Sequence, residues 1–400
     1  MRSTKLMHSS RKNLLLSSAV ALAAFAAVQT DTYAQGCVAV RGTSCNLLSH
    51  EAEHLHPGDW LATLSYRWLH SDHHFAGNED RGPARYAAGN EVINDSHFFD
   101  LSVQYAISDR VSAAMVLPFV YSDRSSLYEH DGVNRHHTQA AGIADMRVGL
   151  YGWLLNPADM PKGNVSFGLG LKLPTGDDNA TDDFVAPGGG TVELPVDQSI
   201  QPGDGGWGAT TEVFAFRQIL PRTMAYFQGS YLFNPQNVND TSTRNARGPR
   251  GFTLEALQTR PQNAALWARA QALGYTSNED FEDVMSITDQ YLMRTGVGYT
   301  IWPKMGLMLT LGGRLEGIPV EDVFGSSDGF RRPGYTISIE PGIALTKGKF
   351  TVNVLAPVAL ERVREKSVAD QRWSELTGRD ENGDAAFADY VITTSISYRF

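Results

Sequence analysis

Apolar and polar residues alternate along most of this chain, and the C-terminal segment 389–400 shows the pattern most clearly. One side of this segment is apolar and ends in aromatic residues: Tyr390, Ile392, Thr394, Ile396, Tyr398 and Phe400. The other side is mostly polar: Asp389, Val391, Thr393, Ser395, Ser397 and Arg399. Successive side chains of a β-strand point to opposite faces, so a period of two predicts a strand between an apolar and a wet environment.

The same alternation recurs in about twelve segments, each close to the ~10 residues that a tilted strand needs to cross a bilayer. These segments are 59–70, 97–107, 110–121, 142–155, 163–175, 206–219, 223–234, 286–301, 305–316, 334–345, 349–361 and 388–400. Segments 206–219 and 223–234 alternate least regularly, so the predicted number is twelve, give or take two. No apolar run is long enough for a transmembrane helix.

Short and long connections between these segments take turns along the chain. The short ones are Ser108-Asp109, Asn156–Lys162, Leu220–Arg222, Trp302–Lys304 and Thr346–Gly348. Short periplasmic turns and long outer loops are typical of outer-membrane barrels. We therefore predict an all-β fold over residues 58–400: a transmembrane antiparallel up-and-down β-barrel of about twelve strands in the outer membrane, with both termini in the periplasm. A soluble sandwich or propeller would leave this rhythm unexplained.

Two of the long connections have patterns that indicate helices. Pro261 to Leu273 begins with a proline, which the first turn of a helix tolerates, and is followed by Gly274. Val368 to Leu376 is a second candidate and is closed by Gly378.

The N-terminus has the pattern of an export signal. Four basic residues precede an apolar stretch from Leu14 to Val28, and a small-x-small site ends at Ala34. We expect residues 1–34 to be a cleaved signal peptide and residues 35–57 to form an N-terminal periplasmic or luminal segment. A membrane anchor is the alternative, and a lipid-modified Cys37 fits the preceding residues poorly.

The charge and the cysteines agree with export. Removing residues 1–34 takes away four basic residues and Asp31, which changes the formal net charge from −10 to −13. An acidic chain argues against nucleic acid as a partner. Cys37 and Cys45 are the two cysteines, and in an oxidising compartment we expect a local disulfide between them, with a metal pair as the alternative.

Charged residues also occur at positions that the alternation turns towards the lumen. On the lipid side an Arg or Lys would cost about 2–4 kcal/mol at the midplane of the membrane. The predicted lumen-lining residues are Arg67, Asp100, Asp145, Arg147, Lys172, Glu212, Arg294, Arg314, Glu316 and Glu340. They would form either a salt-bridged network that packs a narrow barrel or a polar path for a solute. Because both signs occur, we expect no strong ion selectivity.

Residues for metal binding and catalysis are less clearly patterned. His50, His54 and His56 are close in sequence and could bind a transition metal, although their spacing matches no specific site. Ser96 and His97 are adjacent, so on a strand they would face opposite ways and could not form a nucleophile–base pair. We therefore expect neither an enzyme nor a cofactor.

Several local phrases follow one another in a recognisable order: Gly142-Ile143-Ala144-Asp145, Gly170-Leu171-Lys172-Leu173-Pro174-Thr175-Gly176, Gln201-Pro202-Gly203 and Glu340-Pro341-Gly342, together with Leu117-Pro118-Phe119 and Ala356-Pro357-Val358-Ala359-Leu360. In these phrases the chain resembles a known family, the outer-membrane transporters named for the meta-pathway of phenol degradation. The resemblance covers about residues 58–400. It implies a barrel distantly akin to long-chain fatty-acid transporters and passive uptake of small compounds, aromatic or apolar ones among them.

Prolines within predicted strands have a physical interpretation of their own. Pro118, Pro174, Pro341 and Pro357 each remove a hydrogen-bond donor from the sheet. We expect bulges or kinks in the wall at these positions, either as lateral openings or as simple curvature.

Three functional hypotheses follow. The first is a channel whose lumen is lined by charges and shaped by loops 176–205 and 235–285; its partners would be a small solute, the outer-membrane lipid and the barrel-assembly machinery, for which Tyr398 and Phe400 form the C-terminal signal. The second is a structural barrel that displays its loops on the surface. The third is a metal-responsive pore that uses the N-terminal histidines.

Overall fold

The computed structural model describes residues 55–243 and 254–400. The chain divides into two units, residues 1–32 and 33–400, and every described residue belongs to the second. The predicted signal peptide and most of the segment 35–57 therefore lie outside the described residues.

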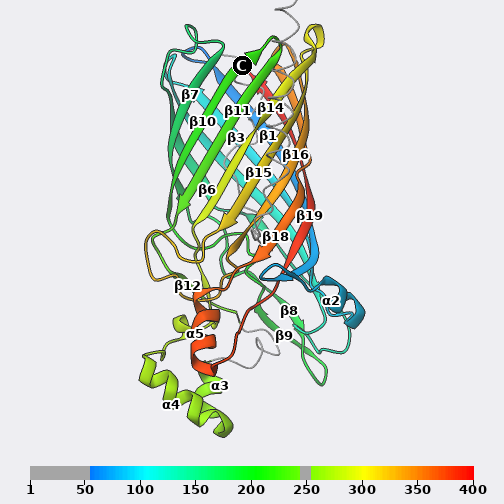
Figure 1. The fold of residues 1–400 in the computed structure, drawn as a ribbon, viewed down its shortest axis with the longest axis vertical. Helices are drawn as coiled ribbons and strands as arrows, with labels where there is room; N and C mark the ends of the chain where they lie inside the picture. Colours follow the sequence, from blue (N-terminus) through cyan, green and yellow to red (C-terminus); the bar gives the residue numbers. More distant parts are fainter. Residues whose placement is uncertain (1–54, 244–253) are drawn as a thin grey trace, which may run out of the picture. The chain divides into compact units, whose positions relative to one another are not determined.

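The strands of the second unit form one closed antiparallel barrel (Figure 1). Neighbours in sequence are neighbours in the wall, and the last strand pairs with the first to close the ring. The strands of the wall are β1 (Trp60–Ala76), β3 (Ile93–Ala106), β4 (Val111–Ser126), β5 (His136–Ile143), β6 (Met146–Trp153), β7 (Gly163–Leu173), β10 (Gly208–Leu220), β11 (Thr223–Phe233), β14 (Gln290–Trp302), β15 (Leu307–Ile318), β16 (Gly334–Lys347), β17 (Phe350–Leu355), β18 (Val358–Arg364) and β19 (Ala385–Arg399).

The predicted twelve-strand barrel is confirmed. Two of the twelve positions in the wall are filled by interrupted strands, β5 with β6 and β17 with β18, because each pair lies along the same neighbouring strand. The two least regular segments, 206–219 and 223–234, correspond to β10 and β11. Several strands extend beyond the predicted ends at the side of the long loops, since β1 continues to Ala76 and β4 to Ser126.

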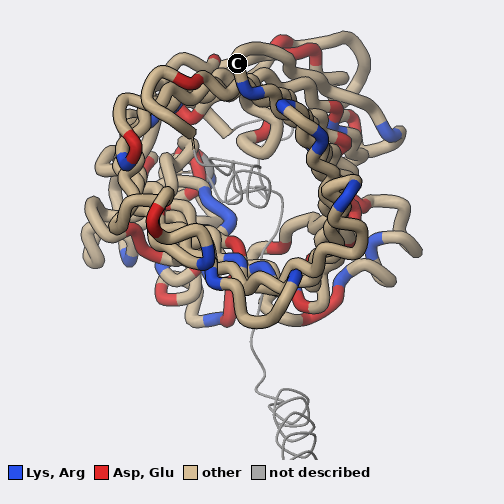
Figure 2. The backbone as a smooth tube through the Cα atoms, turned by 90° about the horizontal axis from the view of Figure 1, so that it is seen from above, with Lys and Arg blue, Asp and Glu red and all other residues tan. Residues whose placement is uncertain are grey.

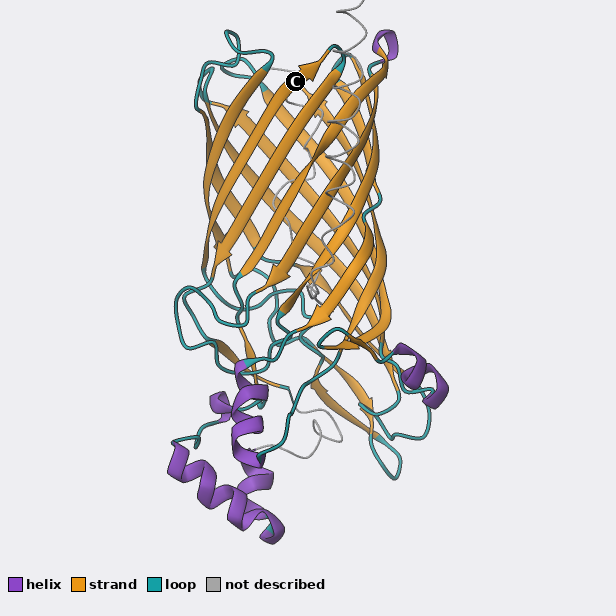
Figure 3. Cartoon of the chain, in the orientation of Figure 1, coloured by secondary structure: helices purple, strands orange, loops and turns teal. Residues whose placement is uncertain are grey.

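The connections alternate between the two ends of the barrel, as predicted. The five short turns lie at the end where the chain terminates, and the long loops lie at the opposite end (Figures 1 and 3). The long loops carry β2 (Glu79–Asp80), α2 (Gly82–Ala88), β8 (Thr181–Val185), β9 (Thr191–Pro195), β12 (Val238–Ser242), α3 (Leu254–Thr259), α4 (Ala264–Leu273), β13 (Val284–Ser286) and α5 (Val368–Thr377).

Both predicted loop helices are present. A short 3-10 turn at Pro261–Asn263 leads into α4, which ends at Gly274 in the left-handed conformation, and α5 ends in the same way at Gly378. Ser367 accepts a hydrogen bond from the backbone of Asp370, whose carboxylate receives one from the Ser367 backbone, so α5 begins with a capping box. None of the described helices is long and apolar enough to cross a membrane.

The outer surface of the barrel is apolar in its middle part. Large hydrophobic side chains such as Leu169, Leu311 and Ile396 are half or more exposed, whereas their strand neighbours Thr310 and Ser395 are buried on the other face. Exposing leucine and isoleucine to water across a whole wall would be unfavourable, so this surface faces lipid.

Aromatic side chains mark both ends of the apolar surface. At the short turns, the rings of Trp60 and Tyr105 and those of Phe350 and Tyr398 lie 4.6 Å apart. Towards the long loops, Trp68 contacts Tyr390. Aromatic girdles on either side of an apolar band are typical of outer-membrane barrels. This barrel is therefore an outer-membrane protein with its short turns towards the periplasm and its long loops outside.

Two interruptions of the wall face a proline on the neighbouring strand. Pro118 of β4 lies opposite the break at Ala144-Asp145, and Pro341 of β16 lies opposite the break at residues 356–357. Backbone groups at both breaks keep partners, because Ala144 N–H donates to the Pro118 carbonyl at 2.8 Å and Ala356 N–H to the Pro341 carbonyl at 3.0 Å. Each of these prolines thus lies where the neighbouring strand is interrupted, and the backbone bonds kept there leave no lateral opening at these positions, which favours the curvature interpretation.

Glycines on the inner face let a tyrosine lie flat against the wall. A Cβ atom at Gly312 would lie 2.5 Å from the hydroxyl of Tyr226 and 2.7 Å from the carbonyl oxygen of Thr295. A Cβ atom at the neighbouring Gly313, on the lipid face, would meet nothing within 4 Å. The two adjacent glycines therefore form a matched pair for a test.

We expect Gly312→Ala to lower the stability of the folded barrel, because overpacking costs about 1–3 kcal/mol. Gly313→Ala should leave stability unchanged or raise it slightly, since it restricts the unfolded chain. The temperature at which the purified protein loses its compact, heat-modifiable form on gel electrophoresis measures both. Equal transition temperatures for the two variants would contradict this account of the inner wall.

Candidate functional site on the inner wall and at the mouth

The predicted lumen-lining charges lie on the strand face opposite the exposed apolar residues. Lys172 is 1% exposed beside Leu171 at 51%, and Glu340 is fully buried between two residues that face lipid. Figure 2 looks along the barrel and shows charged positions of both signs around the ring. Nine of the ten predicted charges lie on wall strands, and Asp145 lies in the break between β5 and β6.

Four of these charges form one buried network on β14, β15 and β16. Arg294 donates to Oε1 of Glu340 at 2.9 and 2.5 Å, and Arg314 donates to Oε2 of the same glutamate at 3.3 Å. Arg314 also forms two hydrogen bonds of 2.8 Å with Glu316. Such bonds between ionised groups are short and strong, and the alternating signs let four buried charges neutralise one another.

The other predicted charges have separate surroundings. Glu212 accepts a hydrogen bond of 3.0 Å from the hydroxyl of Tyr151, and the guanidinium of Arg67 lies 4.4 Å from the centre of the Phe98 ring. In the register of the wall, Asp100 lies opposite Pro118, and Arg147 lies opposite Lys172. The structure thus brings the ten residues together only in part.

An aromatic patch on the inner wall was not predicted. It consists of Trp153 on β6, Phe214 and Phe216 on β10, and Tyr226 on β11. The Trp153 ring meets both phenylalanine rings edge-on at 6.2 and 6.0 Å, and the two phenylalanine rings stack at 6.1 Å. The sequence did contain a signal for this patch: Phe214 and Phe216 lie two and four residues after Glu212, which places all three side chains on the same face of the strand.

The aromatic patch borders the ionic network. Phe214 lies opposite Gln228 in the pairing of β10 with β11, and Gln228 lies opposite Arg294 in the pairing of β11 with β14. The Gln228 side chain accepts a hydrogen bond of 3.4 Å from Arg294. One continuous stretch of the inner wall therefore offers aromatic rings followed by hydrogen-bonding and charged groups.

Asp145 holds both ends of the loop between β7 and β10. Its two carboxylate oxygens accept hydrogen bonds of 3.1 Å from the backbone N–H groups of Gly176 and Asp204. Lys172 forms an ion pair with Asp204 at the same place. The loop leaves and returns so closely that a Cβ atom on Gly176 would lie 2.7 Å from the Cα atom of Gly203, which explains glycine at both positions.

The phrases that carried the family resemblance meet at this loop base. Thr175 donates to the carbonyl of Ala144 at 2.8 Å and accepts a bond of the same length from the N–H of Met146, so its side chain bridges the break between β5 and β6. Pro202 lies within van der Waals reach of a Cβ atom built on Gly142. Residues of the β5–β6 break and of both ends of the β7–β10 loop thus contact one another at the loop base.

Further along the β7–β10 loop, Asp197 links two arginines. Its Oδ2 lies 2.6 Å from Arg332, in the β15–β16 connection, and 3.4 Å from Arg124 on β4. Burial alone would raise the pKa of the Asp197 carboxyl, but the two guanidiniums hold it well below its ordinary value. None of these three residues was predicted, because Arg124 lies past the predicted end of its strand and the other two lie in loops.

The remaining predicted residues have the following positions. Cys37, Cys45, His50 and His54 lie outside the described residues, and the described His56 donates a backbone hydrogen bond of 3.0 Å to Asp59. Ser96 is buried on the inner face and bonds to Ser122, whereas His97 bonds to Tyr66 on the outer face. In the part of the chain that the structure describes, no group of three or more His, Cys, Asp or Glu side chains could hold a metal ion.

The C-terminal residues take part in closing the ring. Phe400 N–H donates to the carbonyl of Trp60 at 2.8 Å, its side chain is 61% exposed, and Tyr398 pairs with both Ala62 and Phe350. Their role in recognition by the assembly machinery stays a prediction.

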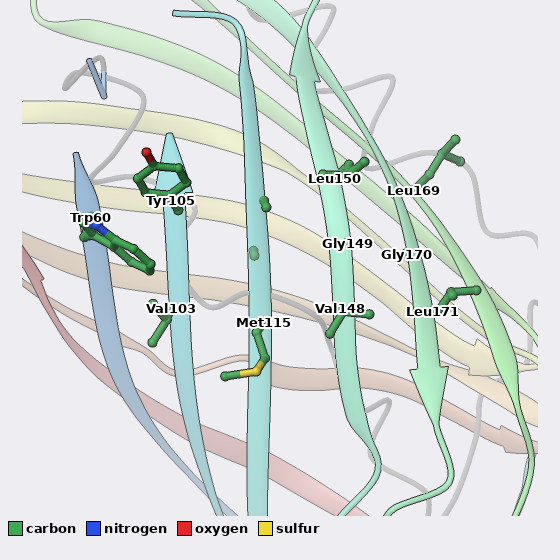
Figure 4. Close-up of a pocket in the computed structure, with 12 residues that line it drawn as sticks. Trp60, Val103, Tyr105, Met115, Val148, Gly149, Leu150, Leu169, Gly170 and Leu171 are labelled. Atoms are coloured by element: carbon green, nitrogen blue, oxygen red, sulfur yellow. The ribbon is translucent and has the colours of Figure 1, made fainter. Parts of the chain in front are cut away.

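A groove of about 690 Å³ lies on the lipid-facing side of the wall (Figure 4). Large apolar side chains such as Trp60, Met115 and Leu169 surround it, and Gly149 and Gly170 contribute to its lining. Because its lining is apolar and faces the membrane, it belongs to the surface that contacts lipid.

Comparison with known proteins gives no family assignment: no protein-family description and no curated protein matches the sequence. Several solved structures are similar to this chain. An outer membrane channel from Pseudomonas putida F1 has a TM-score of 0.49 at 12% identity over 86% of this chain and 97% of that one.

Two further structures are similar to a lesser degree. A Pseudomonas aeruginosa FadL homologue has a TM-score of 0.40 at 7% identity, over 88% of this chain and 93% of that one. The monoaromatic hydrocarbon channel CymD has a TM-score of 0.39 at 10% identity, over 92% and 98%. At these values the function of this chain has to be argued from its own residues.

The loop base can be tested at Asp145. The two N–H groups bind different oxygens of Asp145, and an asparagine replaces one of these oxygens by an NH2 donor, so Asp145→Asn should lose one charge-assisted bond, typically about 1.5–3 kcal/mol. We expect faster amide hydrogen exchange at Gly176 and Asp204 and faster proteolysis within residues 176–203. Asp183→Asn, an exposed carboxylate in the same loop, is the control, and identical exchange in both variants would show that Asp145 does not hold the loop.

Proposed function

We propose that this protein is an outer-membrane channel for the passive uptake of small solutes, with small aromatic compounds that carry a polar group as its preferred class. The observation that carries the proposal is the inner-wall stretch in which the aromatic patch of Trp153, Phe214, Phe216 and Tyr226 borders the Arg294–Glu340–Arg314–Glu316 network. Aromatic rings attract an aromatic solute through stacked and edge-on contacts. The neighbouring amide and charged groups supply partners for its hydroxyl or carboxyl group.

The size of the barrel supports a small solute. Eight strands give an interior that side chains can fill, whereas the 16 to 18 strands of porins leave a wide aqueous channel. Twelve strands lie between these limits. Inner-wall glycines such as Gly296 and Gly312 let Tyr226 lie against the wall, which leaves more room in the interior.

The charges on the inner wall argue against a strongly ion-selective pore. Each arginine of the main network is paired with a glutamate, so the field along the wall alternates in sign. A ring of like charges, which selective pores use, is not formed by these four residues. We accordingly expect weak discrimination between cations and anions.

The outer loops support one second candidate, a barrel that displays a folded surface. Helices α3, α4 and α5 share a small core around Leu257, Phe281 and Leu376, each of which is at most 1% exposed. This core is built from two loops, so the loops have a defined fold. Single-channel conductance in planar bilayers separates the candidates: a sealed barrel supports display, whereas discrete conducting events support the channel.

The aromatic patch makes a specific prediction for a channel that conducts. Phenol added to one side of the bilayer should interrupt the current, and Phe214→Ala should weaken this block by about fivefold, the equivalent of ~1 kcal/mol from one lost aromatic contact. Phe227→Ala is the control, because Phe227 lies on the lipid-facing side of β11. Equal block of both variants would remove the aromatic patch from the proposal.

A further inference from the structure

Segment Val196–Gln201 of the β7–β10 loop, called the strap below, contacts the wall at β3, β4 and β5. Arg124 of β4 donates to the hydroxyl of Ser199 at 3.2 Å, and that hydroxyl lies 3.4 Å from the side-chain oxygen of Asn94 on β3. Val196 and Ile200 are buried and pack with Ala140 of β5. Since Asn94 and Arg124 are buried inner-face residues, the strap reaches inside the rim of the barrel.

The same strap contacts segments from the other side of the barrel. Gln198 donates hydrogen bonds to the carbonyl oxygens of Ser286, the last residue of β13 in the loop before β14, at 2.7 Å, and of Phe330, in the β15–β16 connection, at 3.2 Å. Asp197 binds Arg332 of that connection. In the order of the wall, β3 to β5 and β14 to β16 are separated by several strands in both directions. The strap therefore lies between the wall at β3 to β5 and the loop segments that lead into β14 and β16.

The strap is also held in one conformation. Gln201 accepts a bond from the N–H of Ala180 at 2.8 Å and donates to the carbonyls of Ala180 and Val196 at 3.1 and 3.0 Å. Asp197 accepts from the N–H of Ser199 at 2.9 Å, and Ile200 N–H donates back to Asp197 at 3.0 Å. Its base is joined to the wall by Asp145 through Gly176 and Asp204. These hydrogen bonds restrict the strap to one conformation, so that it can narrow the opening of the barrel.

We propose that the strap is the constriction of the channel and that Asp197, paired with Arg124 on β4 and with Arg332 in the β15–β16 connection, is the residue that sets the size of solute it admits. This inference rests on the proposed channel function and names its specificity-determining residue. Asp197 acts as a positioning residue: it holds the strap between the wall and the β15–β16 connection.

The ion pairs explain why Asp197 would be decisive. Its side chain is 13% exposed, and the two arginines are 3% and 8% exposed. Arg124 also has Glu129 at 2.5 Å, so it stays paired when Asp197 is removed, whereas the ion pair between the strap and Arg332 is lost. Loss of Asp197 should therefore loosen the strap on the β15–β16 side, where the two hydrogen bonds of Gln198 remain, while its attachment to β3 to β5 is kept.

The test measures single-channel conductance in planar bilayers and the largest polyethylene glycol that enters the pore. Asp197→Ala should raise the conductance by about twofold and admit larger polymers, because a wider constriction passes more ions. Asp197→Asn, which keeps the volume of the side chain, should act in the same direction. Arg372→Ala is the matched control: it breaks an ion pair of 2.6 Å between α5 and Asp328 that does not involve the strap.

A cross-link excludes general misfolding as the cause. Cysteines in place of Asp197 and Arg332 should enlarge the conductance like Asp197→Ala, and a short reducible thiol cross-linker between them should restore the smaller conductance until it is reduced. Heat-modifiable migration confirms that each variant is a folded barrel.

The outcomes separate the two proposals. If the wild type conducts and Asp197→Ala leaves conductance and polymer size unchanged, the strap proposal is overturned and the channel stands. If the wild type is sealed and Asp197→Ala conducts, the strap is supported and the passive channel is overturned. If neither protein conducts, both are overturned.

Discussion

The pairing of backbone N–H and C=O groups in lipid is the constraint on which the rest of this structure depends. An unpaired backbone group in the hydrocarbon core costs several kcal/mol, and a sheet avoids this cost only by closing on itself. Here the closing seam between β1 and β19 runs from Leu61–Arg399 to Phe75–Ala385, nearly the full length of both strands. Closure then forces each strand to put one face in lipid and the other in the interior.

Closure also imposes a requirement on the interior: polar side chains that point inward need hydrogen-bond or ionic partners. On β14 to β16 the solution is electrostatic: Glu340, which is fully buried, is shared by Arg294 and Arg314. On β6, β10 and β11 the solution is apolar, since aromatic rings pack on one another and on glycines. The two solutions lie side by side, and this gives the inner wall the mixed character on which the proposed solute class rests.

Where a strand of the wall is interrupted, some backbone N–H and C=O groups lack a partner on the neighbouring strand, and side chains supply the hydrogen bonds instead. At Ala144-Asp145 the hydroxyl of Thr175 and the carboxylate of Asp145 take over the role of a neighbouring strand. The same side chains also fix the base of the β7–β10 loop. The break at Ala144-Asp145 is thus also the place where the base of the β7–β10 loop is attached to the barrel.

Alternation and the order of short and long connections were enough to predict the barrel, because both are local properties of the chain that do not depend on which strands pair. The twelve segments, the order of short and long connections, and helices α4 and α5 were readable in this way, since each depends on residues near in sequence, such as Gly274 or Gly378 at a helix end. The same parity placed Lys172 and Glu340 on the face opposite the lipid-facing residues.

Contacts between loops could not be read from the sequence, because they join residues that lie far apart along the chain. The pairing of Asp197 with Arg332, and of Gln198 with the backbone at Phe330, exists only once the ring is closed and the mouth brings the loops together. The partners of Glu340 were likewise undetermined, since an inward position fixes a direction and leaves open which neighbour a charge will meet. Local periodicity therefore decides which face a side chain takes, and closure of the barrel decides what it meets there.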